Sequence, residues 1–375
     1  MNLCVLSVAY PFAPVSRDAA GGAEQSLNLI DESLVRTGHR SLVVACEGSS
    51  VAGELIAVPR TRGVIGDSER KRIHDHHRAA IRRTLEENPV DIVHLHGLDF
   101  HEYLPPFFNH NGKDKGDSVP ALVTLHLPPA WYPPEIFRLR RPRTLLHCVS
   151  ETQRRSCPPA SEPPPVIPNG VPVERFDIRI SKRNFVFSLG RICPEKGFHL
   201  ALEAAAIART PMLLAGEIFR YPAHEAYFHQ EIAPRLDHQR RFIGPVGFNR
   251  KRRLMAAARC LLAPSLAPET SSLVAMESLA SGTPVIAFPS GALAEIVEDG
   301  VTGFLVNDER EMAEAIRAAS SLDPNACRET ARSRFSAARM VERYFDFYRR
   351  LIAGDALNTF SAVSPRHSAN SILAR

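Results

Sequence analysis

The sequence predicts an α/β protein made of two doubly wound parallel-sheet domains that face each other across a cleft. The chain has 375 residues, which is long for one core and favours two at roughly 150 residues a domain. Short buried strands alternate with helical patterns, an order typical of right-handed parallel sheets. A strand, a glycine turn and a helix follow one another early in each half, so we expect both domains to be Rossmann-like.

The composition is that of an ordinary globular protein, with 44% hydrophobic and 23% charged residues. The net charge of +5 suits an anionic small ligand and does not indicate nucleic acid, for which a clustered basic face would be expected. The apolar run at the N-terminus follows no basic segment, which favours a first strand over a signal peptide. No apolar stretch reaches the roughly 18 residues of a membrane span.

The seven cysteines are scattered and include no CxxC pair. An odd number without such spacing favours reduced thiols and a cytoplasmic protein over a disulfide framework or a structural zinc site. A basic helix predicted at 67–87 leaves a peripheral membrane contact open, although a solvated polar face is the favoured interpretation.

In the N-terminal half, residues 3–9 form a near-continuous apolar run that predicts a strand buried on both faces. Gly21 and Gly22 stand where the following helix begins. Three residues mark the apolar stripe of that helix: Leu27, Ile30 and Leu34. Another strand is predicted at 41–47.

Histidines follow two of the predicted strands. Alternation along the strand at 91–100 places His94 and His96 on one face at its end. After a polar loop at 109–119, the next strand carries His126 at its carboxyl end. Ligands of open α/β sheets lie outside the carboxyl ends of the strands, so we expect these histidines at one rim.

The same histidines permit a second interpretation. With Asp99 and His101 nearby, the His94/His96 cluster is a reasonable ligand set for a metal-dependent hydrolase. No further ligands follow at typical spacing, and the second half of the chain would have no role. We therefore favour structural or acceptor-side histidines.

A proline-dense connector at 157–168 divides the chain. Such a segment continues neither a helix nor a central strand, which places the domain boundary within 170–180. We therefore assign an N-terminal domain to 1–172 and a C-terminal domain to 173–335.

The C-terminal half repeats the alternation of strands and helices. Short buried strands are predicted at 185–189, 212–217, 240–246, 259–265, 284–288 and within 295–306. A long amphipathic run at 332–353 predicts a closing helix, and we assign 336–354 to a helix that turns back towards the N-terminal domain. Residues 355–375 have no strong period and are expected to be a flexible tail.

The stretch at 267–288 carries most of the predicted chemistry. It combines a loop with Glu269, a helix with Glu277 and a buried strand. Backbone amides at the helix N-terminus favour an anion such as a diphosphate. The amides concerned are those of Ser271, Ser272 and Leu273. Glu277 can accept two hydrogen bonds from a ribose diol, and Glu269 can meet a sugar hydroxyl or a basic group. Two solvated charges would be the plainer interpretation, but this pair flanks an apolar helix.

Arg191 and Lys196 directly follow a buried strand, at its carboxyl end. Fixed cations there, together with helix-terminal amides, can stabilise the charge that a leaving diphosphate gains, without a metal. Surface cations in a loop are common, and only the place after the strand favours the functional interpretation.

Several motifs occur in one order along the chain. The glutamates Glu269 and Glu277 are followed by SLASGTPVIAF and GALAEIVEDGVTGFLV, and they are preceded by GGAE, DIVHLH, TLH, VIPNGV and GRICPEKG. As a set these motifs resemble the retaining nucleotide-sugar glycosyltransferases of glycosyltransferase family 4. That family has the GT-B fold, in which two Rossmann-like domains face a deep cleft. The likeness extends over most of the chain.

The resemblance implies catalytic roles for individual residues. Arg191 and Lys196 look like the basic pair that grips the donor diphosphate. Glu277 looks like the ribose ligand, and Glu269 like the carboxylate that contacts the donor sugar. His126 resembles the histidine that lies beside the donor sugar at the reaction centre.

Further donor contacts follow from the same resemblance. Gly21 and Gly22 resemble the N-terminal loop that closes over the phosphate and the sugar. The backbone from Gly244 to Val246 looks like the nucleobase contact.

The chain departs from the family after the first glutamate. Family members usually have an aromatic residue and a glycine there, whereas this chain has Thr270, Ser271 and Ser272. Side chains thus occupy a place where bare backbone often approaches the ligand. We expect the departure to bear on the donor sugar, which the serine hydroxyls would bond.

The resemblance implies a retaining enzyme that moves a hexose-type sugar from a nucleoside diphosphate to an acceptor hydroxyl, with no metal or other cofactor. The leaving phosphate oxygen would help to deprotonate the acceptor on the same face of the sugar. The donor would bind mainly to the C-terminal domain, and a glycan, lipid-linked or small-molecule acceptor to the N-terminal domain. The nucleobase, the sugar and the oligomeric state stay open. A non-catalytic sugar-nucleotide-binding protein is the remaining alternative.

Overall fold

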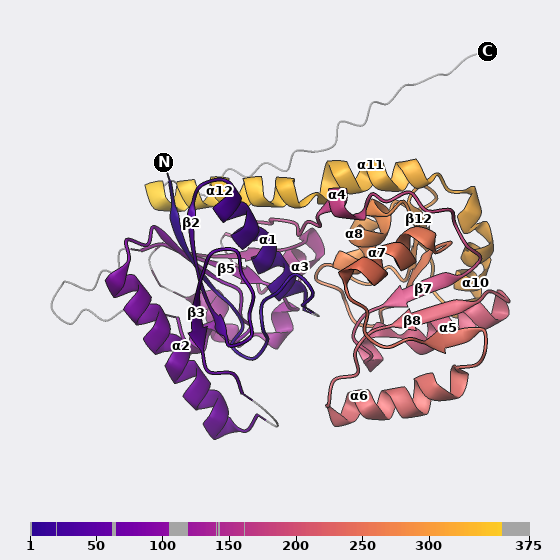
Figure 1. Cartoon of the computed structure of the whole chain (residues 1–375), viewed down its shortest axis with the longest axis horizontal. Helices are drawn as coiled ribbons and strands as arrows, with labels where there is room; N and C mark the ends of the chain where they lie inside the picture. The colour runs from indigo at the N-terminus through magenta and orange to yellow at the C-terminus, as the bar shows by residue number, and fades with distance from the viewer. Residues whose placement is uncertain are drawn as a thin grey trace, which may run out of the picture.

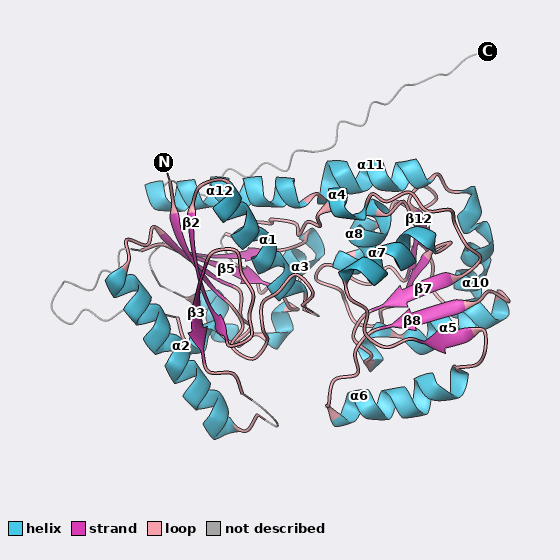
Figure 2. Cartoon of the chain, viewed as in Figure 1, coloured by secondary structure: helices cyan, strands magenta, loops and turns pink. Residues whose placement is uncertain are grey.

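The computed structural model describes residues 2–19, 21–61, 65–104, 119–139, 141, 143–160 and 162–354. Most of the predicted polar loop at 109–119 and the predicted tail at 355–375 lie outside these residues. The described chain forms two six-stranded sheets with flanking helices, side by side (Figures 1 and 2). Neighbouring strands pair in parallel throughout both sheets, which confirms the predicted doubly wound α/β fold.

The N-terminal sheet has the strand order β3-β2-β1-β4-β5-β6. Its strands are β1 (Cys4–Val8), β2 (Arg40–Cys46), β3 (Glu54–Val58), β4 (Ile92–Leu95), β5 (Ala121–Leu125) and β6 (Thr144–Cys148). The helices of this half are α1 (Gly22–Arg36), α2 (Asp67–Glu87) and α3 (Glu151–Arg155). The sequence did not predict β3, because this edge strand is largely half-buried or exposed and lacks a buried apolar run. The strand expected at 91–100 is the shorter β4.

The C-terminal sheet has the order β12-β11-β10-β7-β8-β9. Its strands are β7 (Val186–Leu189), β8 (Met212–Ala215), β9 (Arg240–Phe242), β10 (Leu261–Ala263), β11 (Val285–Ala287) and β12 (Gly303–Leu305). Its helices are α4 (Val173–Phe176), α5 (Phe198–Ile207), α6 (Pro222–Tyr227), α7 (Phe248–Ala257), α8 (Leu273–Ala280), α9 (Leu293–Ile296), α10 (Glu309–Ala318) and α11 (Pro324–Phe335). All the strands predicted for this half are present.

The two sheets share one topology. Counted from its own first strand, each has the order 3-2-1-4-5-6, which reverses direction between β1 and β4 and again between β7 and β10. Such switch points open a crevice at the carboxyl ends of the strands. The loops after β1 and β4 lead to Gly21 and His96, and those after β7 and β10 carry Lys196 and Glu269. The topology thus brings the predicted site residues to the two switch points.

The run at 332–353, expected as one helix, is two helices. α11 ends at Phe335, and α12 (Ala337–Ala353) begins after Ser336, whose Oγ accepts a hydrogen bond from the Arg339 amide at 3.4 Å. The backbone on both sides of the break bonds to Val171 of the domain connector. The break therefore arises from a tertiary contact that the amphipathic period does not contain.

α12 runs from the C-terminal unit across to the N-terminal unit (Figure 1). Its aromatic side is buried with residues of β1, α1, β4 and β5. The aromatic residues concerned are Tyr344, Phe345, Phe347 and Tyr348. The C-terminal helix thus completes the core of the first domain.

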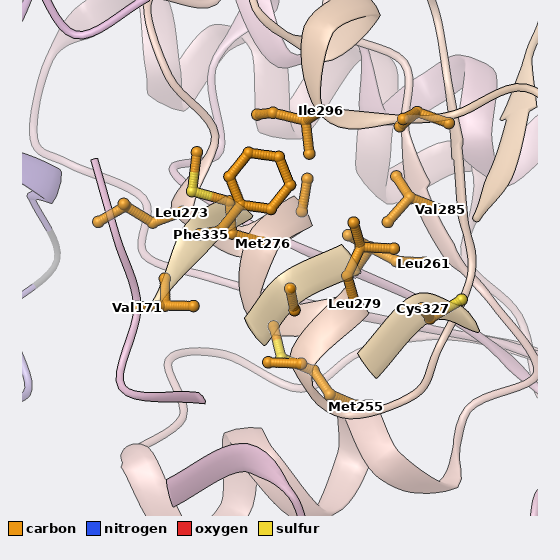
Figure 3. Packing of buried hydrophobic residues seen from close by; sticks show 14 of the residues in the cluster. Val171, Met255, Leu261, Leu273, Met276, Leu279, Val285, Ile296, Cys327 and Phe335 are labelled. Atoms are coloured by element: carbon orange, nitrogen blue, oxygen red, sulfur yellow. The ribbon is translucent and has the colours of Figure 1, made fainter. Parts of the chain in front are cut away.

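The core of the second domain surrounds α8. Every residue of this helix except Val274 is buried. Leu273, Met276 and Leu279 pack in one cluster with Met255 of α7 and Val285 of β11 (Figure 3). Packing on several sides holds the N-terminus of α8 in a defined position.

Candidate functional site

The N-terminus of α8 lies directly after the loop that follows β10. Ser272 caps the helix, because its Oγ accepts a hydrogen bond from the Ala275 amide at 3.4 Å. The Oγ of Ser271 is buried and has no hydrogen-bond partner in the described part of the chain. The first amides of α8 and one unsatisfied hydroxyl therefore lie together, an arrangement that favours an anionic or hydroxyl-bearing ligand.

Glu269 lies before α8 and is held by two side chains. Lys196 Nζ lies 2.5 Å from Glu269 Oε1, and Ser265 Oγ donates to the same oxygen at 2.5 Å. The Glu269 carbonyl accepts the Ala292 amide at 2.7 Å. The structure therefore brings Lys196 and Glu269 together, as expected for two residues of one site.

The loop after β7 packs closely on the loop after β10. The Leu266 amide donates to the Glu195 carbonyl at 2.8 Å. Gly197 has a φ of +62°, and a Cβ there would overlap the Pro264 carbonyl oxygen. Arg191, on the same loop, is exposed. The close packing places this loop and Lys196 beside Glu269.

Glu277 lies inside α8 and pairs with a lysine of α7. Lys251 Nζ is 2.6 Å from Glu277 Oε1, and the side chains are 12% and 4% exposed. Burial raises the pKa of Glu277, while the Lys251 charge opposes that shift. The sequence did not point to Lys251, because it is one of several cations in α7 and its partner is set by tertiary packing.

Residues of both domains line a groove beside this pair. The lining includes Gln25 and Asn28 of α1, Phe176 and Phe248, and Lys251 with Glu277. Gly244 and Val246, the predicted nucleobase contact, lie between β9 and α7. Gly244 has a φ of +67°, and Val246 packs beside the core around α8.

The N-terminus of α1 meets the N-terminus of α8. Gly21 is the N-cap and Gly22 the first residue of α1, which confirms the predicted glycine turn. A Cβ on Gly22 would lie 3.4 Å from Leu273 Cδ1, in ordinary contact with the first residue of α8. Two positive helix ends from different domains are therefore adjacent.

A buried carboxylate covers the start of α1. A Cβ on Gly21 would overlap Glu24 Oε2, so the Glu24 carboxylate lies against the glycine backbone. Burial raises the pKa of Glu24, and the Arg191 charge opposes the shift. Glu24 was not predicted as a site residue, although it stands in the GGAE motif that carried part of the resemblance.

His126 lies between His96 of the N-terminal domain and Thr270 of the loop before α8. His126 Nε2 is 3.1 Å from His96 Nδ1, and the two rings are stacked. Thr270 Oγ1 donates to the His126 carbonyl at 2.8 Å, which joins the N-terminal domain to the loop before α8. Burial, with a smaller effect of His147, lowers the pKa of His126 to about 3. The imidazole is therefore neutral near pH 7.

The His94/His96 cluster does not have the form of a metal site. The two rings do share one face, with centroids 4.0 Å apart, as predicted. However, both ring nitrogens of His94 are hydrogen-bonded to protein groups, Tyr348 Oη and Thr124 Oγ1, each at 2.7 Å. Asp99 bonds to His74 and Tyr103 instead. His94 therefore belongs to a buried hydrogen-bond network, and the hydrolase alternative is not favoured.

Comparisons with known proteins agree with this architecture. A family model described as "Glycosyltransferase Family 4" matches residues 20–175, and one described as "Glycosyl transferases group 1" matches residues 183–321. A D-inositol 3-phosphate glycosyltransferase of Nocardioides sp. is 35% identical over 147 residues, which cover 34% of this chain and 32% of that protein. A phosphatidyl-myo-inositol mannosyltransferase of Mycobacterium leprae is 26% identical over 338 residues, 81% of this chain and 84% of that one.

Solved structures show the same fold. AviGT4, a glycosyltransferase involved in avilamycin A biosynthesis, superposes with a TM-score of 0.69 at 24% identity, covering 94% of this chain and 98% of its own. Anabaena HepE, solved with UDP and glucose, gives 0.71 at 19% identity, covering 93% and 100%. The fold and the paired domain matches define a glycosyltransferase of the GT-B class. Within that class, the chain is similar to glycosyltransferase family 4 over residues 20–175 and to group 1 glycosyl transferases over residues 183–321.

No helix in the described part of the chain combines the length and the apolar character that a membrane span requires.

Proposed function

We propose that the chain is a retaining glycosyltransferase that moves a hexose-type sugar from a nucleoside diphosphate to an acceptor hydroxyl without a catalytic metal. The observation that carries the proposal is the meeting of the α1 and α8 N-termini beside Lys196, supported by the Gly22 to Leu273 contact. The two helix N-termini and the Lys196 ammonium favour a diphosphate, which in this proposal takes the place of the Glu24 carboxylate at the start of α1. Relatives crystallised with UDP or ADP support a nucleotide donor.

In this proposal the donor lies along α8. The diphosphate contacts the amides of Ser272 and Leu273, and Arg191 and Lys196 balance the charge that develops on the leaving phosphate. Glu277 accepts hydrogen bonds from the ribose hydroxyls, and its ion pair with Lys251 is weakened when they bind. Residues 244–246 contact the base, because they lead into the helix that carries Lys251.

The sugar lies between Glu269 and His126. Lys196 and Ser265 both bind Oε1 of Glu269, so Oε2 is the oxygen that meets a sugar hydroxyl. His126 is neutral and accepts or donates a hydrogen bond without adding charge. The acceptor hydroxyl approaches on the face of the leaving phosphate, whose oxygen takes its proton. The unsatisfied hydroxyl of Ser271 gives the departure from the family a role in sugar selection.

The acceptor binds the N-terminal domain, beside the loop that carries His126. A glycan, a lipid-linked glycan or a small polyol is compatible with that place. The names of two relatives, an inositol phosphate glycosyltransferase and a phosphatidylinositol mannosyltransferase, support an acceptor rich in hydroxyl groups. Closure of the two domains would exclude water from the reaction.

A thermal-shift panel of nucleoside diphosphates and nucleotide sugars, run with excess EDTA, tests the proposal. A ligand that binds only the folded state stabilises it by mass action, by about 2.7 kcal/mol at one hundred times Kd. We expect one nucleobase to raise the melting temperature, and its sugar conjugate to do so too. No stabilisation by any member of the panel would contradict the proposal.

A further inference from the structure

A second group of polar side chains lies on the loop after β7, away from Glu269 and Glu277. Cys193, Glu195 and His224 each offer one ligand atom, and these atoms all lie within 4.8 Å of one another. Cys193 and Glu195 belong to the turn at Pro194–Lys196, and His224 to the first turn of α6. Elements separate in sequence thus bring a thiol, a carboxyl and an imidazole together.

One nitrogen of the His224 imidazole is available for a ligand. His224 Nδ1 is buried and makes no hydrogen bond within the described residues. The backbone around it is fixed, because the His224 amide donates to the Tyr221 carbonyl at 2.9 Å. Cys193 is 1% exposed, whereas Glu195 is exposed. The cluster therefore combines a buried sulfur, an unsatisfied nitrogen and an exposed carboxylate, Glu195, from whose side a metal ion can enter.

We propose that Cys193, Glu195 and His224 form a Zn²⁺ site with one position open to water. Zn²⁺ takes thiolate, imidazole and carboxylate ligands at about 2.0–2.3 Å. In a tetrahedral site two such ligand atoms lie about 3.3–3.8 Å apart, so side-chain rotations that move the present atoms by about 1 Å close the site. Mg²⁺ and Ca²⁺ prefer oxygen ligands, which a thiol and an imidazole do not supply.

The chemistry of the cysteine makes metal binding dependent on pH. Zn²⁺ binds the thiolate, so binding breaks the S–H bond, forms the Zn–S bond and releases one proton to solvent. The Arg191 charge acts on all three groups; it repels a cation and favours the thiolate.

The site would restrain the loop that contains Arg191 and Lys196. Glu195 directly precedes Lys196, and the metal would fasten it to α6 on the other side of the loop. The scattered cysteines gave no CxxC signature, because only one thiol takes part and the histidine comes from a separate helix. This inference does not depend on the proposed transferase chemistry.

Cobalt and zinc titrations of the full chain, stripped of metal with EDTA and desalted, test the site. Co²⁺ bound by a thiolate gives a sulfur-to-cobalt charge-transfer absorption, which Zn²⁺ should abolish by displacement. We expect one Co²⁺ per chain, no charge-transfer band for Cys193→Ser, and at least tenfold weaker binding for His224→Gln. Cys157→Ser, which changes a half-buried cysteine away from the cluster, should bind as the unmodified chain does.

A second readout does not use the spectrum. Zn²⁺ should raise the melting temperature of the unmodified chain and of Cys157→Ser, but not that of His224→Gln, and Mg²⁺ should raise none. His224 is on the first turn of a surface helix, so we expect His224→Gln to fold. It can be measured even if Cys193→Ser does not fold. Absence of binding, or a band and a thermal shift that survive both Cys193→Ser and His224→Gln, would overturn the proposal.

Discussion

At the residue scale, two lysine–carboxylate pairs form the centre of the proposed donor site. Glu269 with Lys196 and Glu277 with Lys251 are both well shielded, and each pair joins different elements. Removal of one partner from a buried pair leaves an uncompensated charge, which costs more than an exposed ion pair would. Variants in these pairs therefore need a stability control beside the functional assay.

Glu277→Gln should weaken nucleotide binding about tenfold or more, which corresponds to about 1.4 kcal/mol, because the amide cannot accept two ribose hydroxyls. Isothermal titration with the nucleoside diphosphate chosen by the thermal-shift panel measures this. The exposed Glu314→Gln of α10 is the matched control and should bind normally. Equal affinity of the two variants would remove Glu277 from the donor site.

Lys196→Ala should lower the rate of sugar transfer by about two to three powers of ten, because a fixed charge at the leaving phosphate is lost. Ser265 still holds Glu269 in this variant. Initial rates at saturating donor measure the effect, with the exposed Arg310→Ala as the control for removal of a cation. Unchanged turnover in Lys196→Ala would contradict its role.

The sequence could predict those candidate site residues that stand in an ordered motif, such as Glu269, Glu277 and Lys196. It could not predict the role of Lys251, nor that the Glu24 carboxylate lies against the Gly21 backbone. Nothing in the pattern of α7 separates Lys251 from its basic neighbours, and its partner lies on another helix. Long-range pairing of this kind depends on packing, which a local motif does not encode.

At the element scale, glycine turns place the loops around α8. Gly291 has a φ of +62°, and a Cβ there would overlap the Glu269 backbone. Gly300 has a similar φ of +72° with nothing within 4 Å. Gly291 is needed both for its left-handed backbone and for the close approach of the Glu269 backbone. Gly300 is needed only for its left-handed backbone.

Gly291→Ala should destabilise the chain more than Gly300→Ala, because both variants share the backbone strain of about 1 kcal/mol or more and only the first displaces Glu269. Urea unfolding measures the difference in the free energy of unfolding. Donor KM should rise for Gly291→Ala alone. Equal stability and equal KM for the two variants would show that the Glu269 backbone contact has no role.

The elements themselves were largely predictable, since α1, α2 and the buried strands follow clear apolar periods. The exceptions were β3 and the break at Ser336. β3 is an edge strand without a buried run, and the break depends on bonds between Val171 and the backbone beside Ser336. Both features are set by neighbours distant in sequence.

At the scale of the whole molecule, several contacts hold the two domains together. Glu295 of α9 accepts hydrogen bonds from the backbone amides of Glu151 and Thr152 at the start of α3. Thr270 bonds to His126, and α12 crosses between the units. Thr270 directly follows Glu269 in the sequence, so domain position and the geometry of the proposed site are coupled.

Stability should fall as the pH is lowered from about 6.5 to about 4. Burial lowers the pKa of both His77 and His147 to about 4, from about 6.5 for an exposed histidine. In this window the unfolded chain binds more protons than the folded chain, so the free energy of unfolding rises with pH, by up to about 1.4 kcal/mol per pH unit for each histidine.

Urea midpoints at pH 7.5, 6 and 5 and constant ionic strength measure this slope. His147→Asn should reduce it, whereas the exposed His76→Asn should leave it unchanged. A flat profile down to pH 5 would mean that these histidines are not buried in the neutral form.

The central claim is that the sugar is transferred with retention of its anomeric configuration and without a metal. Proton NMR of the glycoside that forms first tests this claim most directly. The donor selected by the thermal-shift panel would be incubated with the chain in excess EDTA, with glycerol as a surrogate acceptor hydroxyl. The account predicts a product with the anomeric configuration of the donor, formed in excess EDTA as well as without it. An inverted first product, or turnover that EDTA abolishes, would contradict it.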